Sequence, residues 1–156
     1  MPAAARYQAM AMKKMLIALA LAAAAGPVLA QNTPVGLWRT IDDDTQVEKS
    51  QVRISETGGV LSGKIEKIAE AGKQDSKCEK CSDERKDKPV LGMEIIRNAK
   101  AHADKAAWEG GDILDPNNGK VYKLRLKPVD GGKKLEVRGF IGVALLGRTQ
   151  TWIRVE

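Results

Sequence analysis

In Val121-Tyr122-Lys123-Leu124-Arg125-Leu126-Lys127, apolar and basic side chains alternate from Tyr122 onward. Because successive side chains of a β-strand point to opposite faces, one face of this segment is apolar and the other basic. A strand with one buried and one solvated face is typical of an antiparallel sheet. Turn-forming residues stand on both sides of it, at 115–119 and at 130–132, where Gly and Asn accept the positive φ of tight hairpins.

The same period of two recurs in Leu135-Glu136-Val137-Arg138 and in Val52-Arg53-Ile54-Ser55, and Leu61, Gly63 and Ile65 share one face of a further strand. Eight strands are predicted, near residues 35–41, 49–56, 60–68, 91–97, 107–114, 120–127, 134–141 and 147–155. Short strands at this spacing, with no internal repeat, predict an all-β fold, a single antiparallel up-and-down barrel of about eight strands. A barrel of this size is either filled by its own side chains or holds one small ligand.

Two segments interrupt the alternation. Residues 69–88 carry six basic and six acidic side chains. We expect this stretch to be a solvated loop, with a flap over a barrel mouth as one possible role. Residues 98–106 are rich in Ala and Lys and contain His102, which suits a single short helical turn or a loop.

The first thirty residues have the features of an export signal. They contain Arg6, Lys13 and Lys14 and no acid, then an apolar run from Met15 to Ala25, and they end in Gly26-Pro27-Val28-Leu29-Ala30. This order predicts a secretory signal peptide over residues 1–30, cleaved after Ala30, and a periplasmic or secreted domain over residues 31–156. A membrane anchor is the weaker alternative, because a spanning helix needs about 20 apolar residues.

Three methionines are candidates for the start of translation. Met1, Met10 and Met12 all precede Lys13, and residues 1–9 add nothing that a signal peptide needs.

Cleavage changes the charge of the chain. It removes three basic residues from a formal net charge of +6 and leaves +3 on 126 residues, which fit one domain. This mild balance is spread along the chain, and no basic run interleaves with aromatics, so a nucleic-acid partner is not predicted. No long apolar run remains after residue 30, so no transmembrane segment is predicted in the mature chain.

The only two cysteines form the motif Cys78-Glu79-Lys80-Cys81. In an exported protein such a pair favours a disulfide that tightens its loop. A redox pair is the alternative, but thioredoxin-like centres lie at a helix N-terminus inside a βαβ unit. A metal site would need two further ligands.

The residue types exclude several catalytic classes. One histidine and two cysteines cannot build a structural zinc finger or a three-histidine zinc site, and no metal or cofactor is predicted. The Gly-x-Ser-x-Gly elbow of common hydrolases is absent. His102 is a conceivable general base, but a solvated loop histidine is the favoured interpretation. No catalytic residue is therefore predicted.

Two acidic segments are interpreted as turns. Residues 112–120 lack the alternating ligands and the closing Glu of an EF-hand, while Asp-Pro and Asn-Gly are turn dipeptides. Asp42-Asp43-Asp44 is expected to be an exposed turn between the first two strands.

The ends of the domain carry tryptophan and arginine. Trp38 lies on the first predicted strand, and Arg148, Trp152 and Arg154 lie on the last. If the barrel closes, these strands are neighbours, and an arginine of the last strand can stack on Trp38 by a cation–π contact. That role would be structural.

A Gly-x-Trp on the first strand and an Arg on the last resemble the lipocalin and calycin barrels. More closely, the chain is similar to the bacterial secreted family known as domain of unknown function 2147. The matching stretches are residues 34–40, the Cys78–Cys81 pair, residues 87–95, residues 108–116, and residues 136–142 running on to 147–152. The resemblance implies a lipocalin-like barrel in the periplasm or outside the cell, and no agreed activity, ligand or catalytic residue.

Three functions follow as hypotheses. The first is binding of a small hydrophobic or anionic ligand in the cell envelope, because a small barrel offers an apolar pocket with a few orienting polar groups. The second is an accessory protein with a filled barrel, whose partner surface is the 69–88 loop. The third is an enzyme that uses carboxylates such as Glu94 and Glu109. The candidate ligand-binding residues are Trp38, Trp108, Tyr122, Arg138, Arg148 and Trp152.

Overall fold

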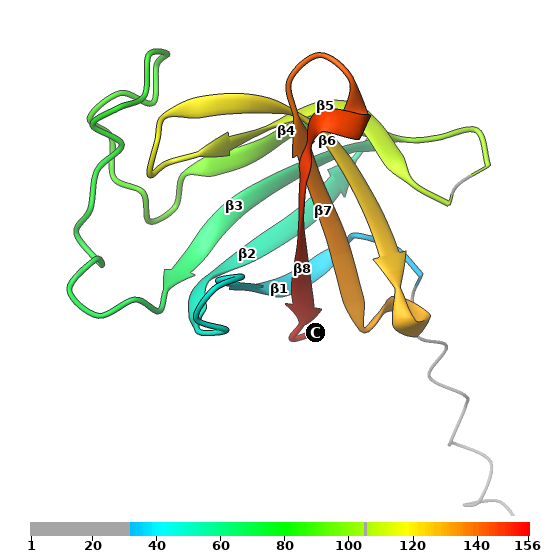
Figure 1. The fold of residues 1–156 in the computed structure, drawn as a ribbon, viewed down its shortest axis with the longest axis horizontal. Helices are drawn as coiled ribbons and strands as arrows, with labels where there is room; N and C mark the ends of the chain where they lie inside the picture. Colours follow the sequence, from blue (N-terminus) through cyan, green and yellow to red (C-terminus); the bar gives the residue numbers. More distant parts are fainter. Residues whose placement is uncertain (1–31, 105) are drawn as a thin grey trace, which may run out of the picture.

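A computed structural model describes residues 32–104 and 106–156, and eight antiparallel strands close these ranges into a barrel in chain order (Figure 1). The strands are β1 (Gly36–Ile41), β2 (Glu48–Thr57), β3 (Val60–Ile68), β4 (Glu94–Ala101), β5 (Trp108–Asp115), β6 (Lys120–Val129), β7 (Lys134–Phe140) and β8 (Arg148–Arg154). Strand β8 returns to β1, with Arg154 opposite Trp38. The all-β up-and-down barrel is thus confirmed, while the expected signal peptide at residues 1–30 lies outside the described residues.

The described ranges also contain two short 3-10 helices, η1 (Asp130–Gly132) and η2 (Ala144–Leu146). No helix in the described ranges has the length and hydropathy to cross a bilayer.

The alternation in the sequence sets which side chains fill the barrel. On β6, Leu124 and Leu126 are buried while Lys123, Arg125 and Lys127 are exposed, as predicted. The strands contribute further apolar residues to one buried cluster, which includes Val52, Ile54, Leu61, Ile96, Leu135, Val137 and Trp152. Burial of this apolar surface is the main source of the stability of the barrel.

The two ends of the barrel differ. At one end, here called the closed end, lie Trp38, Trp108, Leu126, Leu135 and Trp152, all buried. The opposite end, here called the mouth end, carries the connections at residues 42–47, 69–93, 116–119 and 141–147.

Strand β4 corrects the prediction for residues 98–106. The expected turn or loop begins only after Ala101, because β4 continues through Asn98 in a left-handed conformation (φ 61°). The register between β3 and β4 shifts between Leu61 and Gly63. An asparagine tolerates the left-handed region better than most residues, so a strand irregularity replaces the expected break.

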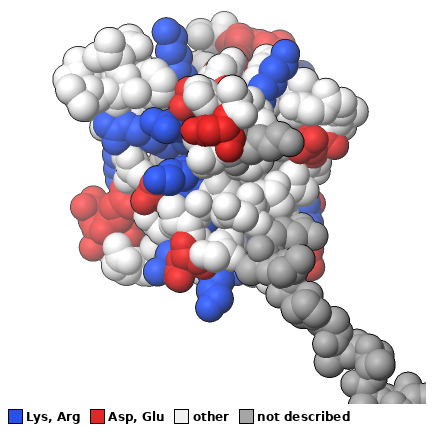
Figure 2. All heavy atoms as spheres, turned by 90° about the vertical axis from the view of Figure 1, so that its right-hand side faces the viewer, with Lys and Arg blue, Asp and Glu red and all other residues white. Residues whose placement is uncertain are grey.

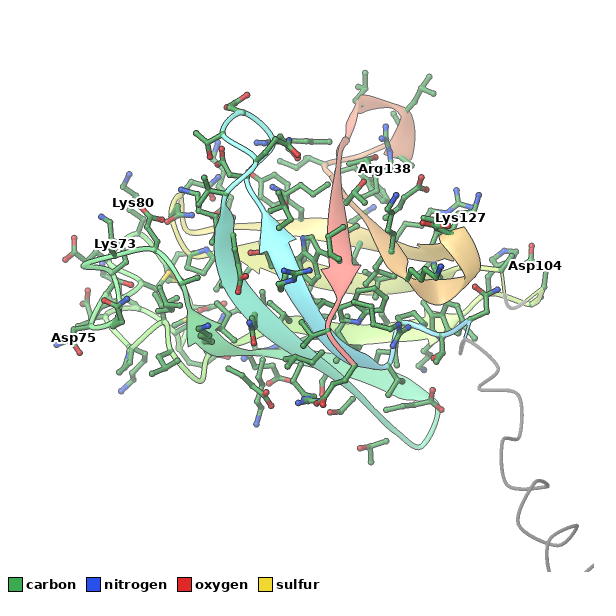
Figure 3. All side chains as sticks on the ribbon, turned by 90° about the horizontal axis from the view of Figure 1, so that it is seen from below. Lys73, Asp75, Lys80, Asp104, Lys127 and Arg138 are labelled. Atoms are coloured by element: carbon green, nitrogen blue, oxygen red, sulfur yellow. A yellow bond between two sulfur atoms is a disulfide. The ribbon has the colours of Figure 1, made fainter. Side chains whose placement is uncertain are left out.

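The 69–93 loop corrects the expectation of a fully solvated segment. Cys78, Cys81 and Arg85 are buried, and the two cysteines form the predicted disulfide. Figure 1 shows the loop in green at the left of the barrel, and Figure 3 shows its Lys73, Asp75 and Lys80 on the outside. The loop is therefore charged on one side and packed on the other.

The packed side of this loop covers the outer face of β4 and β5. Ile95 and Ile96 are successive residues of one strand, yet both are buried, and Ile96 faces the interior opposite Gly63. Ile95 must then point outward, and it belongs to the same buried cluster as Cys78 and Cys81. The buried cluster thus extends beyond the barrel interior and holds the loop.

Arg85 is the buried charged residue of this loop. Its guanidinium donates to the Asp83 carboxylate at 2.5 Å and to the Glu94 carbonyl at 3.0 Å. A buried guanidinium requires such partners, because an unpaired one would lose its hydration without compensation. The composition of this loop did not reveal its buried side, because the contacts of Arg85 with Asp83 and Glu94 form only when the chain folds.

Candidate functional site

One layer of interior-facing residues stands above the packed core, toward the mouth end. Each member lies two or three residues from a buried interior residue of its own strand, as Thr40 does from Trp38 and Gln150 from Trp152. All of them are partly exposed, whereas the residues below them are buried. This mouth layer consists of Thr40, Ser50, Ile68, Ile113, Tyr122, Gly139 and Gln150.

One side of the mouth layer is apolar and is lined by Ile113, Tyr122 and Gly139. A Cβ atom added to Gly139 would lie 3.4 Å from Cβ of Tyr122 and 3.7 Å from Cγ2 of Ile113, which are ordinary or nearly ordinary contacts. The phenol oxygen of Tyr122 accepts a hydrogen bond from Nδ2 of Asn118 at 3.0 Å, which ties the ring to the β5–β6 turn. A methyl group is therefore accommodated at Gly139, in contact with Tyr122 and Ile113.

The opposite side of the mouth layer is polar. The hydroxyl oxygens of Thr40 and Ser50 lie 2.9 Å apart across β1 and β2, and the Ser50 N–H donates to Oγ1 of Thr40 at 3.1 Å. Together with the Gln150 amide, these hydroxyls provide hydrogen-bonding groups facing an apolar wall. This arrangement suits a ligand with one polar and one apolar end.

Arg148 stands at the rim of the mouth. It has the interior-facing parity of Gln150 and Trp152, and its guanidinium contacts Oδ2 of Asp43 at 2.5 Å from Nη2 and 3.0 Å from Nε. The Asp43 carboxylate raises the pKa of Arg148 through this hydrogen bond and its charge. The pair joins the first residue of β8 to the acidic 42–44 turn, where Asp43 and Asp44 are exposed as predicted.

The three tryptophans lie at the closed end rather than at the mouth. Trp38 is fully buried, and its Nε1 donates to the Pro34 carbonyl at 2.7 Å. Trp108 and Trp152 are buried in the same cluster. The predicted stacking is confirmed, since the guanidinium carbon of Arg154 lies 4.1 Å from the centre of a Trp38 ring. The three indoles therefore fill and close the barrel.

Arg138 points away from the interior. It lies opposite Arg125 on β6 and Thr149 on β8, on the outward parity of β7. Its guanidinium donates to the carbonyls of Ala144 and Leu145 and to the Thr149 hydroxyl. Of the candidate ligand-binding residues, only Tyr122 and Arg148 thus lie at the mouth.

The candidate catalytic carboxylates do not meet. Glu94 lies 3.5 Å from Nε of Arg97, and Glu109 lies 3.0 Å from Nε of Arg125. Glu109 is opposite Lys100, six residues along β4 from Glu94, a separation of about 20 Å. Each carboxylate has its own cation, and the two do not form an acid–base pair.

His102 is exposed on the outer surface, with Nδ1 3.2 Å from Oδ1 of Asp104. It borders an open groove of about 590 Å³ on the outside of β4 and β5. Within the described ranges, no three His, Cys, Asp or Glu side chains gather as a metal site. Figure 2 shows basic and acidic side chains intermixed on one face of the molecule, without a continuous basic patch.

Sequence analysis missed the polar members of the mouth layer. Thr40 is two residues from Trp38, and Gln150 is two residues from Trp152, so the period of two already placed each on the interior face. Gly139 was not predicted, because glycine has no side chain and so contributes neither an apolar nor a polar group to the alternation. The alternation could therefore have identified these polar residues, but the predicted binding residues were chosen among aromatic and basic side chains.

Comparisons with known proteins agree with the barrel fold. The structure is similar to one titled "Protein HP1028 from the human pathogen Helicobacter pylori belongs to the lipocalin family", with a TM-score of 0.67 at 19% identity over 78% of this chain and 82% of the other. A comparison with curated proteins gave no match. Residues 36–154 match the family described as "Uncharacterized protein conserved in bacteria (DUF2147)". The chain therefore belongs to the DUF2147 family and has a lipocalin-like barrel.

Proposed function

We propose that this protein is exported and binds one small amphipathic ligand at the mouth layer of its barrel. The observation that carries the proposal is the change in burial along the interior: residues at the closed end are buried, and those of the mouth layer are partly exposed on seven strands. A barrel serving only as a packed scaffold has no need of an interior layer that combines hydroxyls, an amide and a glycine.

The chemistry of the layer defines the ligand class. Ile113 and Tyr122 offer an apolar wall, while Thr40, Ser50 and Gln150 offer hydrogen bonds. Arg148 at the rim suits a carboxylate or phosphate, which would replace Asp43 as its partner. Because the layer below is fully packed, the apolar part must be short or remain partly outside.

A filled barrel that acts as an accessory protein is the second candidate. The packing of Trp38 and Trp152 at the closed end favours it, because these side chains leave no space for a ligand at that depth. In that case the 69–93 loop offers a charged partner surface, with Lys73, Asp75 and Lys80 outward (Figure 3).

Ligand binding is tested with two matched variants and defined probes. Gly139→Leu fills the mouth layer from inside, whereas Thr149→Leu adds the same side chain on the outward face of β8. We expect decanoate or decyl phosphate to raise the melting temperature of the wild type and of Thr149→Leu but not of Gly139→Leu. Native mass spectrometry of protein isolated from its own cell should show a retained small molecule. If neither measurement detects binding to the wild type, the ligand proposal fails.

Export is tested separately by N-terminal sequencing of protein recovered outside the inner membrane. We expect the chain to begin at Gln31, because the apolar run ends in a small-residue cleavage site. An exported chain that retains an intact Met15–Ala30 segment would contradict this cleavage.

A further inference from the structure

The connection between β7 and β8 presents large apolar side chains to solvent. Ile141 is 66% exposed, Val143 60%, Leu145 88% and Leu146 80%. Isolated exposed apolar residues are ordinary, but four in one seven-residue loop form a concentrated apolar surface. Figure 1 shows this 141–147 loop in red at the top of the barrel, where it projects from the strands.

The backbone of this loop is already hydrogen-bonded within the chain. Nε of Arg138 donates to the Ala144 carbonyl at 2.7 Å, and its Nη2 donates to the Leu145 carbonyl at 3.2 Å. The 3-10 turn adds bonds from the N–H of Leu146 to Val143 and from the N–H of Gly147 to Ala144. Figure 3 shows Arg138 beside the loop. Arg138 therefore braces the turn while the apolar side chains point away.

This arrangement fits hydrocarbon better than water. Backbone groups that enter a bilayer must find their partners within the protein, because lipid tails offer none. Arg138 and the 3-10 turn provide such partners for the carbonyls of Val143, Ala144 and Leu145. A projecting apolar tip also suits insertion into a soft surface, whereas a stable contact with a rigid protein requires a complementary face.

The charges beside the loop point to anionic headgroups. Lys123 lies opposite Phe140 on β7 and opposite Asp112 on β5, and Arg138 is two residues before Phe140 on the same outward face. Neither Lys123 nor Arg138 has a carboxylate partner within the part of the chain that the structure describes. In the acidic 42–44 turn, Asp43 is already paired with Arg148. Basic side chains at the base of an apolar tip match the phosphate level of a bilayer.

We infer that the 141–147 loop inserts into the interfacial region of a lipid bilayer, with Lys123 and Arg138 against anionic headgroups. This inference does not depend on the ligand proposal, because it uses the outward face of β6 and β7. Insertion would place the barrel mouth next to the bilayer surface.

A dye attached to the loop tests insertion directly. A Leu145→Cys variant of the full chain is labelled with an environment-sensitive fluorophore. Cys78 and Cys81 are buried in a disulfide and do not react. A Thr57→Cys variant, labelled at the β2–β3 turn of the closed end, is the matched control. With vesicles of phosphatidylcholine and phosphatidylglycerol, we expect a blue shift and quenching by acyl-brominated lipid at position 145 and not at position 57.

Affinity measurements separate the two contributions. The Leu145→Ser/Leu146→Ser double variant should bind these vesicles at least about tenfold more weakly, since two exposed leucines no longer enter the lipid. Lys123→Glu should weaken binding by about fivefold or more, and only for anionic vesicles. Lys127→Glu, farther along β6 toward the closed end, should have a smaller effect. Because all these side chains are exposed, the melting temperatures should stay close to that of the wild type.

Three results would overturn the inference. They are equal fluorescence changes at positions 145 and 57, vesicle affinity unaffected by the double leucine variant, and a self-associated species that depends on Leu145 and Leu146 without vesicle binding. The last result would assign the loop to a second copy of this chain.

Discussion

The guanidinium carbon of Arg154 lies 4.1 Å from the centre of a Trp38 ring, and this contact joins the last strand of the barrel to the first. The β1–β8 ladder registers two residue pairs, and backbone hydrogen bonds between Leu37 and residues 155 and 156 extend it. Arg154 also donates to the carbonyls of Thr33, Val35 and Gly132. Burial lowers the pKa of this guanidinium, and the ring and carbonyls replace the water it loses.

Arg154→Lys should destabilise the barrel by about 2 kcal/mol. A lysine keeps the charge but cannot stack flat on Trp38 and bond several carbonyls at once. Urea unfolding followed by tryptophan fluorescence measures the loss. Arg39→Lys, on the exposed outward face of β1, is the control and should cost little. An Arg154→Lys protein as stable as the wild type would show that the β1–β8 pairing does not depend on this contact.

Gly119→Ala should loosen the 69–93 loop. A Cβ at this position would fall on the carbonyl of Lys80, a backbone group that cannot move without shifting the loop. Gly119 also has a φ of 72°, a left-handed conformation that is strained for alanine. Gly58→Ala is the control for this strain, because Gly58 has a φ of 58° and open space around it. That shared cost is about 1 kcal/mol.

Hydrogen exchange is the measurement for this pair of variants. We expect faster exchange over residues 69–93 in Gly119→Ala and not in Gly58→Ala. Equal exchange in both variants would mean that the loop is not held against the β5–β6 turn.

Replacing both Cys78 and Cys81 by alanine should cost about 2 kcal/mol, the closure entropy expected for a four-residue loop. The effect should be concentrated in the 69–93 loop, where both side chains are buried. Mass spectrometry after alkylation, with and without reduction, checks the bond itself. Free thiols in protein isolated from an oxidising compartment would contradict the disulfide.

The Asp83–Arg85 pair should make stability depend on pH. The hydrogen bond from Arg85 holds the pKa of Asp83 below its usual value. A carboxyl whose pKa is lower in the folded state stabilises the protein above the unfolded pKa, and this contribution is lost as pH falls through the folded pKa. Asp83→Asn should therefore cost about 1–3 kcal/mol at neutral pH, since it leaves the buried Arg85 without its anion.

The difference between wild type and Asp83→Asn should begin to shrink as pH falls below about 4, where Asp83 of the unfolded chain becomes neutral. It should continue to shrink until pH has fallen through the lowered pKa of Asp83 in the folded protein. Urea unfolding at neutral and acid pH measures this convergence. Asp75→Asn, an exposed acid in the same loop, is the control and should show no such dependence. A cost for Asp83→Asn that is constant with pH would contradict the assigned role of the ion pair.

The period of two in residues such as 121–127 was enough to predict a closed eight-strand barrel, because alternation is a local property of each strand. The Cys78–Cys81 disulfide was predicted from the expected export of the chain. An arginine over Trp38 was predicted because closure of the barrel makes the first and last strands neighbours. The continuation of β4 through Asn98 was not predicted, because a single residue in a left-handed conformation leaves the composition of the segment unchanged.

The remaining features depend on register and on contacts between distant segments. Parity assigns Trp38 and Thr40 to one face, but the height of each residue in the closed barrel decides that the first is packed and the second reaches the mouth. Arg85 is buried because the 69–93 loop folds over Ile95, an interaction that no local pattern encodes. Arg138 faces outward and braces the 141–147 loop because its register places it between Arg125 and Thr149. Local alternation sets the faces of the strands, and only the closed, staggered sheet determines which side chains meet.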